Sequence, residues 1–291
     1  MIRRRELLIG SLMAAPMLGG LAASAQERWE EDKVREALFA LDRKHGGRLG
    51  VAILDSGNGR IVAHRGEERF AMCSTFKLVA AACVLARVDR GEEELERSVR
   101  YSKADLITYS PVTEKHVEKG LTMAELCDAA VTLSDNTAGN LLLDSIGGPK
   151  GLTAYMRSLG DEASRLDRRE PDLNEARTGD PRDTTTPVAM AGVLRQIVLG
   201  GALSPALRQQ LTTWLVANKT GDKRLRAGVP KGWRIGEKTG TGNNNVTNDI
   251  GVIWPPGRAP LVVTAYYAES SAAFPEREAV LAEAGRLASS L

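Results

Sequence analysis

Hydrophobic and polar residues alternate in two sections of the chain, one near each end. Residues 48–55 alternate around Leu49, Val51 and Ile53, and after a Ser-Gly-Asn-Gly turn the chain returns at 60–64. This pattern predicts a β-hairpin. Three more strands are predicted late in the chain, at 233–238, 247–254 and 261–268.

Between these two groups of strands, the apolar positions recur at helical spacing, and Gly, Pro, Asn or Asp separate the segments. The predicted helices of this block cover 75–88, 122–131, 135–145, 149–158, 187–199 and 205–217. Two further helices are predicted near the ends of the chain, at 27–45 and 275–290.

This order of elements indicates an α+β fold in which all five strands form one antiparallel sheet. We expect the terminal helices on one face and the helical block behind the other, which gives three layers (α-β-α) plus an all-helical lobe. The predicted domains are a discontinuous sheet domain, residues 26–68 and 218–291, and a helical domain, residues 69–217. We expect the site at the seam between them, where ligand clefts are favoured.

The first 25 residues have the features of an export signal. Arg3-Arg4-Arg5 precede an apolar run of small residues, and Ala23-Ser24-Ala25 fits the small-x-small cleavage rule. An uncleaved membrane anchor is the alternative, but glycines and Pro16 within the run make a poor spanning helix. We predict a cleaved signal peptide, residues 1–25, and a periplasmic protein. Arg4-Arg5 also resembles a twin-arginine signal, so the Sec and twin-arginine routes both stay open.

Charge and composition exclude several classes of partner. The formal net charge is +2, and the arginines at the start of the chain carry this excess, so the remainder is neutral. Aromatic residues make up only 4%. A neutral body with few stacking residues argues against nucleic acid as a partner. No other stretch is long and apolar enough to span a membrane, so we expect no membrane contact after signal removal. A monomer is the expected state.

The cysteines and histidines do not form a metal site in the sequence. Cys73, Cys83 and Cys127 have no metal-ligand spacing with one another or with a histidine, and the three histidines are scattered. A zinc hydrolase therefore lacks its ligand set, and we expect neither a metal nor a cofactor.

Candidate chemistry begins with a Ser-x-x-Lys motif at Ser74-Thr75-Phe76-Lys77. If a helix begins at Ser74, Lys77 lies one turn further on the same face. A serine hydroxyl needs an adjacent base, and a desolvated lysine can serve. The alternative is an ordinary helix cap beside a surface lysine, which the motif alone favours.

Two further motifs are equally weak when taken alone. Ser134-Asp135-Asn136 places a hydroxyl and a carboxamide at a break between helices, where a helix cap is the common alternative. Lys-Thr-Gly occurs at 219–221 and at 238–240. The first follows a helix and is interpreted as a structural stop. The second ends an alternating strand, where its lysine and hydroxyls could hold a substrate carboxylate, so we choose 238–240.

The order of these motifs resembles that of the active-site serine penicillin-recognising enzymes. A fourth segment, Arg168-Arg169-Glu170-Pro171-Asp172-Leu173-Asn174, resembles the Ω-loop signature of class A serine β-lactamases, here at 164–183. The resemblance covers essentially the whole mature chain. It implies hydrolysis of the β-lactam amide of penicillins and cephalosporins through a serine acyl-enzyme, and antibiotic resistance. The alternatives are a peptidoglycan D,D-carboxypeptidase or transpeptidase and a penicillin-binding sensor that does not turn over.

The resemblance also implies roles for individual residues. Ser74 is the expected nucleophile, Lys77 and Glu170 its proton acceptors, Ser134 the donor to the lactam nitrogen, and Glu170 with Asn174 the holders of the deacylating water. The expected substrate-binding residues are Tyr109, Asn136, Arg224, Lys238, Thr239, Gly240 and Thr241. The backbone N–H groups of Ser74 and Thr241 are the expected oxyanion hole. Arg168 and Asp183 match the ion pair that holds the Ω-loop.

The cysteines depart from the family pattern. Cys73 precedes the nucleophile, as in members that bridge it to a cysteine after the Lys-Thr-Gly strand, but that later position is Gly242 here. Cys127 resembles half of another family disulfide, whose partner falls near Ala81. Cys83 lies two residues further on, about 200° around a helix. We predict three free thiols.

Overall fold

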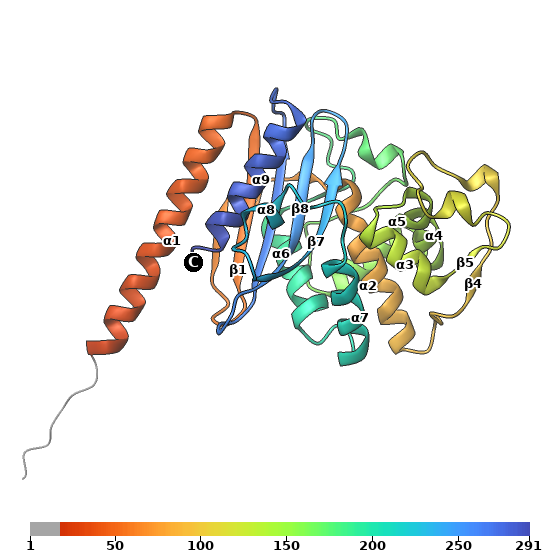
Figure 1. The fold of residues 1–291 in the computed structure, drawn as a ribbon, viewed down its shortest axis with the longest axis horizontal. Coiled ribbons are helices and arrows are strands. Elements are labelled where there is room, and N and C mark those ends of the chain that lie inside the picture. The colour runs from red at the N-terminus through yellow and green to blue at the C-terminus, as the bar shows by residue number, and fades with distance from the viewer. Residues whose placement is uncertain (1–17) are drawn as a thin grey trace, which may run out of the picture.

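The computed structural model describes residues 18–291. Its centre is an antiparallel sheet of five strands in the order β2-β1-β9-β8-β7 (Figure 1). The strands are β1 (Arg48–Asp55), β2 (Ile61–His64), β7 (Arg234–Thr241), β8 (Thr247–Trp254) and β9 (Leu261–Ala268). The predicted α+β fold and its single five-stranded sheet are confirmed.

The sheet is buried on both faces because each face has its own apolar core. Along β1 the side chains alternate between the two cores: Leu49, Val51 and Ile53 belong to one, Ala52 and Leu54 to the other. This is the period-2 arrangement of a pleated strand. In β9 all eight residues are buried. The buried middle of the sheet therefore supports the edge strand β7, which contains the second Lys-Thr-Gly motif.

One face of the sheet is covered by helices from both ends of the chain, α1 (Leu18–His45) and α9 (Phe274–Ala288), together with the short α8 (Leu225–Gly228) (Figure 1). Val34 and Leu38 of α1 share a core with Val280 and Leu281 of α9. The predicted helix at 27–45 is thus part of a longer one. Most of the predicted signal sequence, residues 1–17, lies outside the described residues. Within residues 18–291, none of the helices has both the length and the apolar character needed to cross a membrane.

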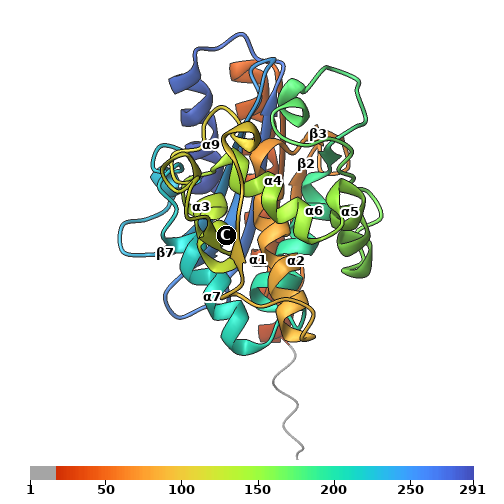
Figure 2. The same cartoon turned by 90° about the vertical axis from the view of Figure 1, so that its right-hand side faces the viewer.

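The helical block covers the other face and faces the viewer in Figure 2. It consists of α2 (Phe76–Asp89), α3 (Met123–Thr132), α4 (Asn136–Ser145), α5 (Gly148–Ser158), α6 (Pro187–Leu194) and α7 (Pro205–Val216). Every residue of α2 from Phe76 to Ala86 is buried, so this helix is the core of the block. The predicted helix at 187–199 is not continuous, because α6 ends at Leu194 and a π-helical turn, Arg195–Leu199, follows.

The structure also contains short elements that the pattern did not predict. β3 (Phe70–Ala71) pairs with β6 (Thr184–Thr185), and β4 (Ser98–Val99) pairs with β5 (Leu121–Thr122). Single turns of 3₁₀ helix lie at Cys73–Thr75, Lys103–Asp105, Thr113–Lys115 and Asp172–Glu175. The β3–β6 pair matters for function because it joins the segment before Ser74 to the end of the Ω-loop.

Candidate active site

Ser74 lies in the 3₁₀ turn Cys73–Thr75, directly before α2. Lys77 is on the first turn of α2, and its Nζ donates to Ser74 Oγ at 3.0 Å. Both residues are buried, Lys77 completely. The spacing in the motif therefore gives the expected contact of a hydroxyl with an amine.

Lys77 Nζ lies among acceptors from two other segments. It donates to Ser134 O at 2.9 Å and to Asn136 Oδ1 at 2.6 Å, and Glu170 Oε1 is 2.9 Å away. The lysine reaches them because α4 has Gly139 beside it, where a Cβ would be 2.7 Å from Lys77 Cε. Any larger residue at this position would displace the amine.

Burial changes the proton affinity of both lysines in the site. Desolvation lowers the pKa of Lys77, and the neighbouring Glu170 carboxylate opposes this shift. Desolvation lowers the pKa of Lys238 well below its ordinary range, and the charges of Lys77 and Arg224 lower it further. Burial rather than like-charge repulsion is thus the larger cause. Both amines are held closer to the neutral state that can accept a proton.

Ser134 lies between the two lysines. Its backbone has a positive φ of 59°. Its carbonyl accepts from Lys77 Nζ at 2.9 Å, and Lys238 Nζ donates to its Oγ at 3.0 Å. The next residue, Asp135, is fully buried and caps α4 by accepting from Ala138 N at 2.8 Å. Asp135 also accepts from Thr113 N at 2.9 Å, so it anchors the turn that holds Ser134.

Glu170 points from the Ω-loop toward the nucleophile. Ser74 Oγ donates to its Oε1 at 3.3 Å, and Asn174 Nδ2 donates to its Oε2. Its backbone is held by Asn140 of α4, which accepts from Glu170 N at 3.0 Å and donates to Glu170 O at 3.0 Å. Asn174 Oδ1 is buried and has no hydrogen-bond partner among the described residues. It is an acceptor available beside the carboxylate.

The Ω-loop is closed by an ion pair near its two ends. Arg168 Nε lies 2.5 Å from Asp183 Oδ2, and Asp183 Oδ1 accepts from the backbone N–H groups of Asp167 and Arg168 at 2.8 Å each. Arg168 also pairs with Glu175 Oε2 at 2.6 Å. These contacts fix the loop segment that carries Glu170.

On the sheet side, Arg224 is buried against the end of β7. Its Nη1 donates to Gly240 O at 3.0 Å, its Nη2 donates to Thr241 Oγ1 at 2.8 Å, and its Nε pairs with Glu278 of α9 at 3.3 Å. Gly240 itself packs closely on the turn before α2, since a Cβ there would be 2.8 Å from Met72 O. A positive charge therefore backs the edge strand next to Ser74.

A cleft of about 500 Å³ opens beside Ser74. Its lining residues are Ser74, Tyr109, Ser134, Asn136, Asn174, Lys219, Thr220, Arg224, Thr239, Thr241, Phe274 and Glu278. Tyr109 is at the rim, 58% exposed, with a positive φ of 67°. Asn136 donates from Nδ2 to Thr108 O at 2.7 Å, so its amide already bridges Lys77 and this rim loop. Lys77, Glu170, Lys238 and Gly240 lie behind the lining surface.

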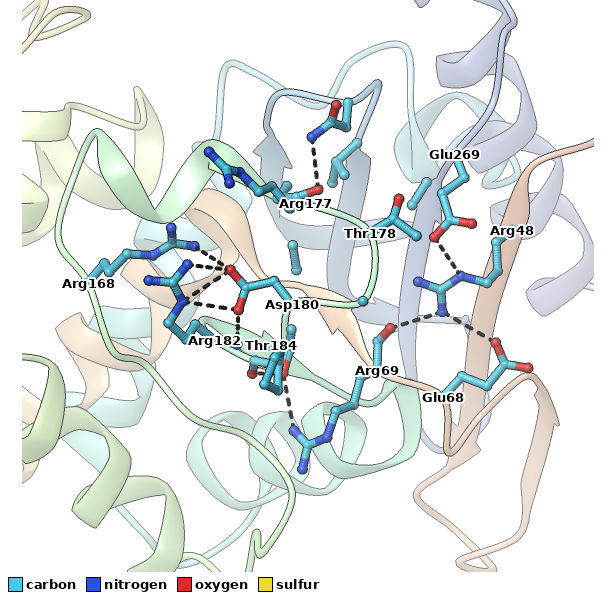
Figure 3. Close-up of a pocket in the computed structure, with 17 residues that line it drawn as sticks. Arg48, Glu68, Arg69, Arg168, Arg177, Thr178, Asp180, Arg182, Thr184 and Glu269 are labelled. Carbon is cyan, nitrogen blue, oxygen red and sulfur yellow. Dashed lines mark hydrogen bonds and ion pairs between the residues drawn. The ribbon is translucent and has the colours of Figure 1, made fainter.

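A second hollow of about 470 Å³ lies behind the Ω-loop (Figure 3). Four of its five arginines pair with carboxylates, as Arg182 does with Asp180 at 2.7 Å and Arg48 does with Glu68 and Glu269 at 3.3 and 3.2 Å. Among its lining residues, Arg69 binds only neutral acceptors. Ser74 does not line this hollow. Its ion pairs lie within the Ω-loop or join β1 to the segments next to β3 and β9. Arg69 instead donates to Ala163 O and Thr184 Oγ1, the residues that flank the loop.

The first Lys-Thr-Gly, expected to be a structural stop, does follow the end of α7, and its Lys219 and Thr220 also line the cleft. Thr220 Oγ1 is 2.5 Å from Thr239 Oγ1 of the second copy. Its similarity to the second copy was the available signal. Asn140 was also missed as a support of the site, and no short motif marks its distant contacts. Asp135 belongs to the Ser-Asp-Asn motif, but its contact with Thr113 was not predicted. Among the described residues no group of three or more His, Cys, Asp or Glu side chains is arranged to hold a metal.

Comparison with known proteins identifies the family of this chain. The model of the β-lactamase enzyme family matches residues 32–290. β-Lactamase CTX-M-8 of Citrobacter amalonaticus is 47% identical over 95% of this chain and 95% of its own. The chain belongs to the class A serine β-lactamases. β-Lactamase L2 of Stenotrophomonas maltophilia is 45% identical over 100% of this chain and 99% of its own.

Solved class A β-lactamases share the fold. An ancestral class A β-lactamase of Gram-negative bacteria (GNCA) superposes with a TM-score of 0.86 at 66% identity, covering 87% of this chain and 98% of that one. This class A chain differs from the disulfide-bridged pattern considered above, since Cys73, Cys83 and Cys127 are all free and buried. A Cβ at Gly242 would be 2.6 Å from Cys73 Sγ, so the absence of a bridge is due to the residue at 242 rather than to distance.

Proposed function

We propose that this protein hydrolyses the amide bond of β-lactam antibiotics, penicillins and cephalosporins, through an acyl-enzyme on Ser74, and so confers resistance. The observation that carries the proposal is the buried contact of Ser74 Oγ with both Lys77 Nζ, at 3.0 Å, and Glu170 Oε1, at 3.3 Å. Two bases within reach of one hydroxyl suit a reaction with two proton transfers, one for making the ester and one for breaking it.

In the acylation step Ser74 Oγ attacks the lactam carbonyl and its proton passes to Lys77 or Glu170. The backbone N–H groups of Ser74 and Thr241 stabilise the oxyanion. Ser134 gives its hydroxyl proton to the departing nitrogen, and Lys238, which donates to Ser134 Oγ at 3.0 Å, lies where it can restore that proton. Lys238, Thr239, Thr241 and Arg224 hold the substrate carboxylate.

In the deacylation step Glu170 takes a proton from water, and that water attacks the ester. Asn174 supports this role because its Nδ2 orients the carboxylate while its unpartnered Oδ1 can accept from the same water. This carboxylate is what favours a lactamase over the D,D-carboxypeptidase or transpeptidase and over the penicillin-binding sensor. Those proteins also form an acyl-enzyme on the serine, but they do not need a carboxylate base in the Ω-loop to hydrolyse it.

Steady-state hydrolysis of benzylpenicillin and of a cephalosporin, followed by absorbance, tests the proposal. We expect many turnovers per active site, and none with Ser74→Ala. A burst equal to the enzyme concentration that then stops would instead identify a sensor. Release of D-alanine from a D-Ala-D-Ala peptide, without lactam turnover, would identify the peptidase.

We also propose that the protein is exported to the periplasm after cleavage of residues 1–25 and acts there as a monomer. The sequence support is the apolar run with its Ala23-Ser24-Ala25 cleavage pattern. Mass spectrometry of the periplasmic fraction should find a chain that begins at Gln26. Blocking the twin-arginine translocase distinguishes the two export routes, and sedimentation of the purified protein tests the monomer.

A further inference from the structure

A row of hydrogen bonds runs behind the edge of the cleft assigned to the substrate carboxylate. Asn218 Nδ2 donates to Glu237 O at 2.8 Å, which turns Asn218 Oδ1 toward Thr220. Asn218 Oδ1 accepts from Thr220 N at 2.7 Å and from Thr220 Oγ1 at 2.8 Å. Thr220 Oγ1 is in turn 2.5 Å from Thr239 Oγ1. The row thus ends on a hydroxyl of the second Lys-Thr-Gly motif.

The number of hydroxyl hydrogens fixes the direction of this row. Each threonine has one hydroxyl hydrogen, and an amide oxygen only accepts. The hydrogen of Thr220 is committed to Asn218 Oδ1, so the hydrogen between the two threonines comes from Thr239. In this arrangement the Thr239 oxygen presents only lone pairs to the cleft. A carboxylate has no hydrogen to give and cannot bond to it.

We propose that Thr220 is a positioning residue that reverses this row when a lactam with a free carboxylate binds. The inference rests on the proposed function. In the reversed row Thr220 Oγ1–H donates to Thr239 Oγ1, and Thr239 Oγ1–H donates to the carboxylate. Both hydroxyls rotate about their C–O bonds, and no covalent bond breaks. Asn218 Oδ1 keeps the N–H of Thr220, so the reversal leaves no acceptor of the row without a donor.

The reversed row favours a negative charge. A hydrogen bond to a carboxylate is about twice as strong as one between neutral groups. A donor behind Thr239 polarises its hydroxyl and strengthens that bond further. A neutral ester in the same position gains much less. Thr220 therefore contributes selectively to the recognition of lactams that carry the free acid.

Kinetics of Thr220→Val and Thr220→Ser test this inference with benzylpenicillin and its methyl ester. Valine keeps the shape of threonine but cannot donate, whereas serine keeps the hydroxyl. We expect the valine variant to raise KM for the acid about fivefold, the worth of one hydrogen bond, with little change in kcat. The kcat/KM of the ester, or its inhibition constant against the acid if turnover is slow, should stay unchanged. The serine variant should restore the wild-type KM.

The outcomes separate this inference from the proposed function. Failure of the wild-type protein to turn over benzylpenicillin would remove the proposed function. If the wild type turns over benzylpenicillin but the valine variant has an unchanged or lower KM, only the proposed reversal of the row is overturned. The same holds if acid and ester are affected equally, or if serine does not rescue. Melting temperatures confirm that each variant is folded, and Thr220→Ala replaces valine if that variant is not.

Discussion

Lys77 and Glu170 form an ion pair in which both side chains are fully shielded from solvent and Nζ lies 2.9 Å from Oε1. Two opposite charges can stay in the interior because each compensates the other, whereas either one alone is costly to bury. Ser74 Oγ is within hydrogen-bonding distance of both. The contacts that hold this pair together therefore also keep two groups that exchange protons, an amine and a carboxylate, beside the nucleophile.

Replacing Glu170 by glutamine should separate the two halves of the reaction. Glutamine can still accept from Asn174 but cannot take a proton from water, so deacylation should slow by about 10²–10⁴-fold. Intact-mass spectrometry after mixing with benzylpenicillin should show the added mass of one penicillin. Asp172→Asn removes an exposed carboxylate two residues away and should show no accumulation. Turnover of benzylpenicillin by Glu170→Gln at the wild-type rate would contradict the deacylation role.

The ion pair of Arg168 and Asp183 should stabilise the Ω-loop. Asp183 is buried, so Arg168→Met leaves its charge without its main partner and should cost about 3 kcal/mol in the free energy of unfolding. Arg182→Met is the matched control, since Arg182 is 47% exposed and its pair with Asp180 is a surface ion pair, which contributes little to stability. Urea unfolding measures both. Equal losses in the two variants would rule out a special role for Arg168.

Stability should fall with rising pH because of a buried acid pair on β7 and β8. Desolvation raises the pKa of Asp249 well above its ordinary value, and the charge of Glu237 raises it further. The folded state therefore keeps a proton that the unfolded chain releases above about pH 4. Between that pH and the raised pKa the unfolded state binds fewer protons, so the free energy of unfolding decreases as pH rises.

Asp249→Asn mimics the protonated acid, because the amide of asparagine can donate to Glu237. In the wild type Leu225 N donates to Asp249 Oδ2 at 3.1 Å, and the amide oxygen of asparagine can still accept this bond. We expect urea unfolding between pH 5 and 9 to show a flatter dependence in this variant than in the wild type. Asp172→Asn should keep the wild-type slope. An unchanged slope in Asp249→Asn would show that the pair does not hold the proton.

The three cysteines should titrate as thiols. Denatured, unreduced protein should react with three equivalents of a thiol reagent, because Cys73, Cys83 and Cys127 are all free. The native protein should react slowly, since all three are buried and desolvation raises the pKa of Cys83 to about 11. Fewer than three equivalents in the denatured protein would reveal a disulfide.

Local patterns were enough to predict the elements that have a regular period. The hairpin of β1 and β2 follows from alternation around Val51, and α2 follows from its apolar run. The contact of Ser74 with Lys77 also follows from spacing, because one helical turn brings them together. The break after Leu194 was missed because the apolar pattern continues through the π-helical turn.

The sequence by itself determined the long strands and helices, the motifs and the family they resemble, since each depends on residues close together in the chain. Only the tertiary structure decided which distant groups meet. Lys238 and Ser134 are 104 positions apart, and Asn140 holds Glu170 across 30. The pairing of β3 with β6 and the place of Thr220 in the cleft are of the same kind. Such contacts depend on how two buried cores pack together, and no local period records that packing.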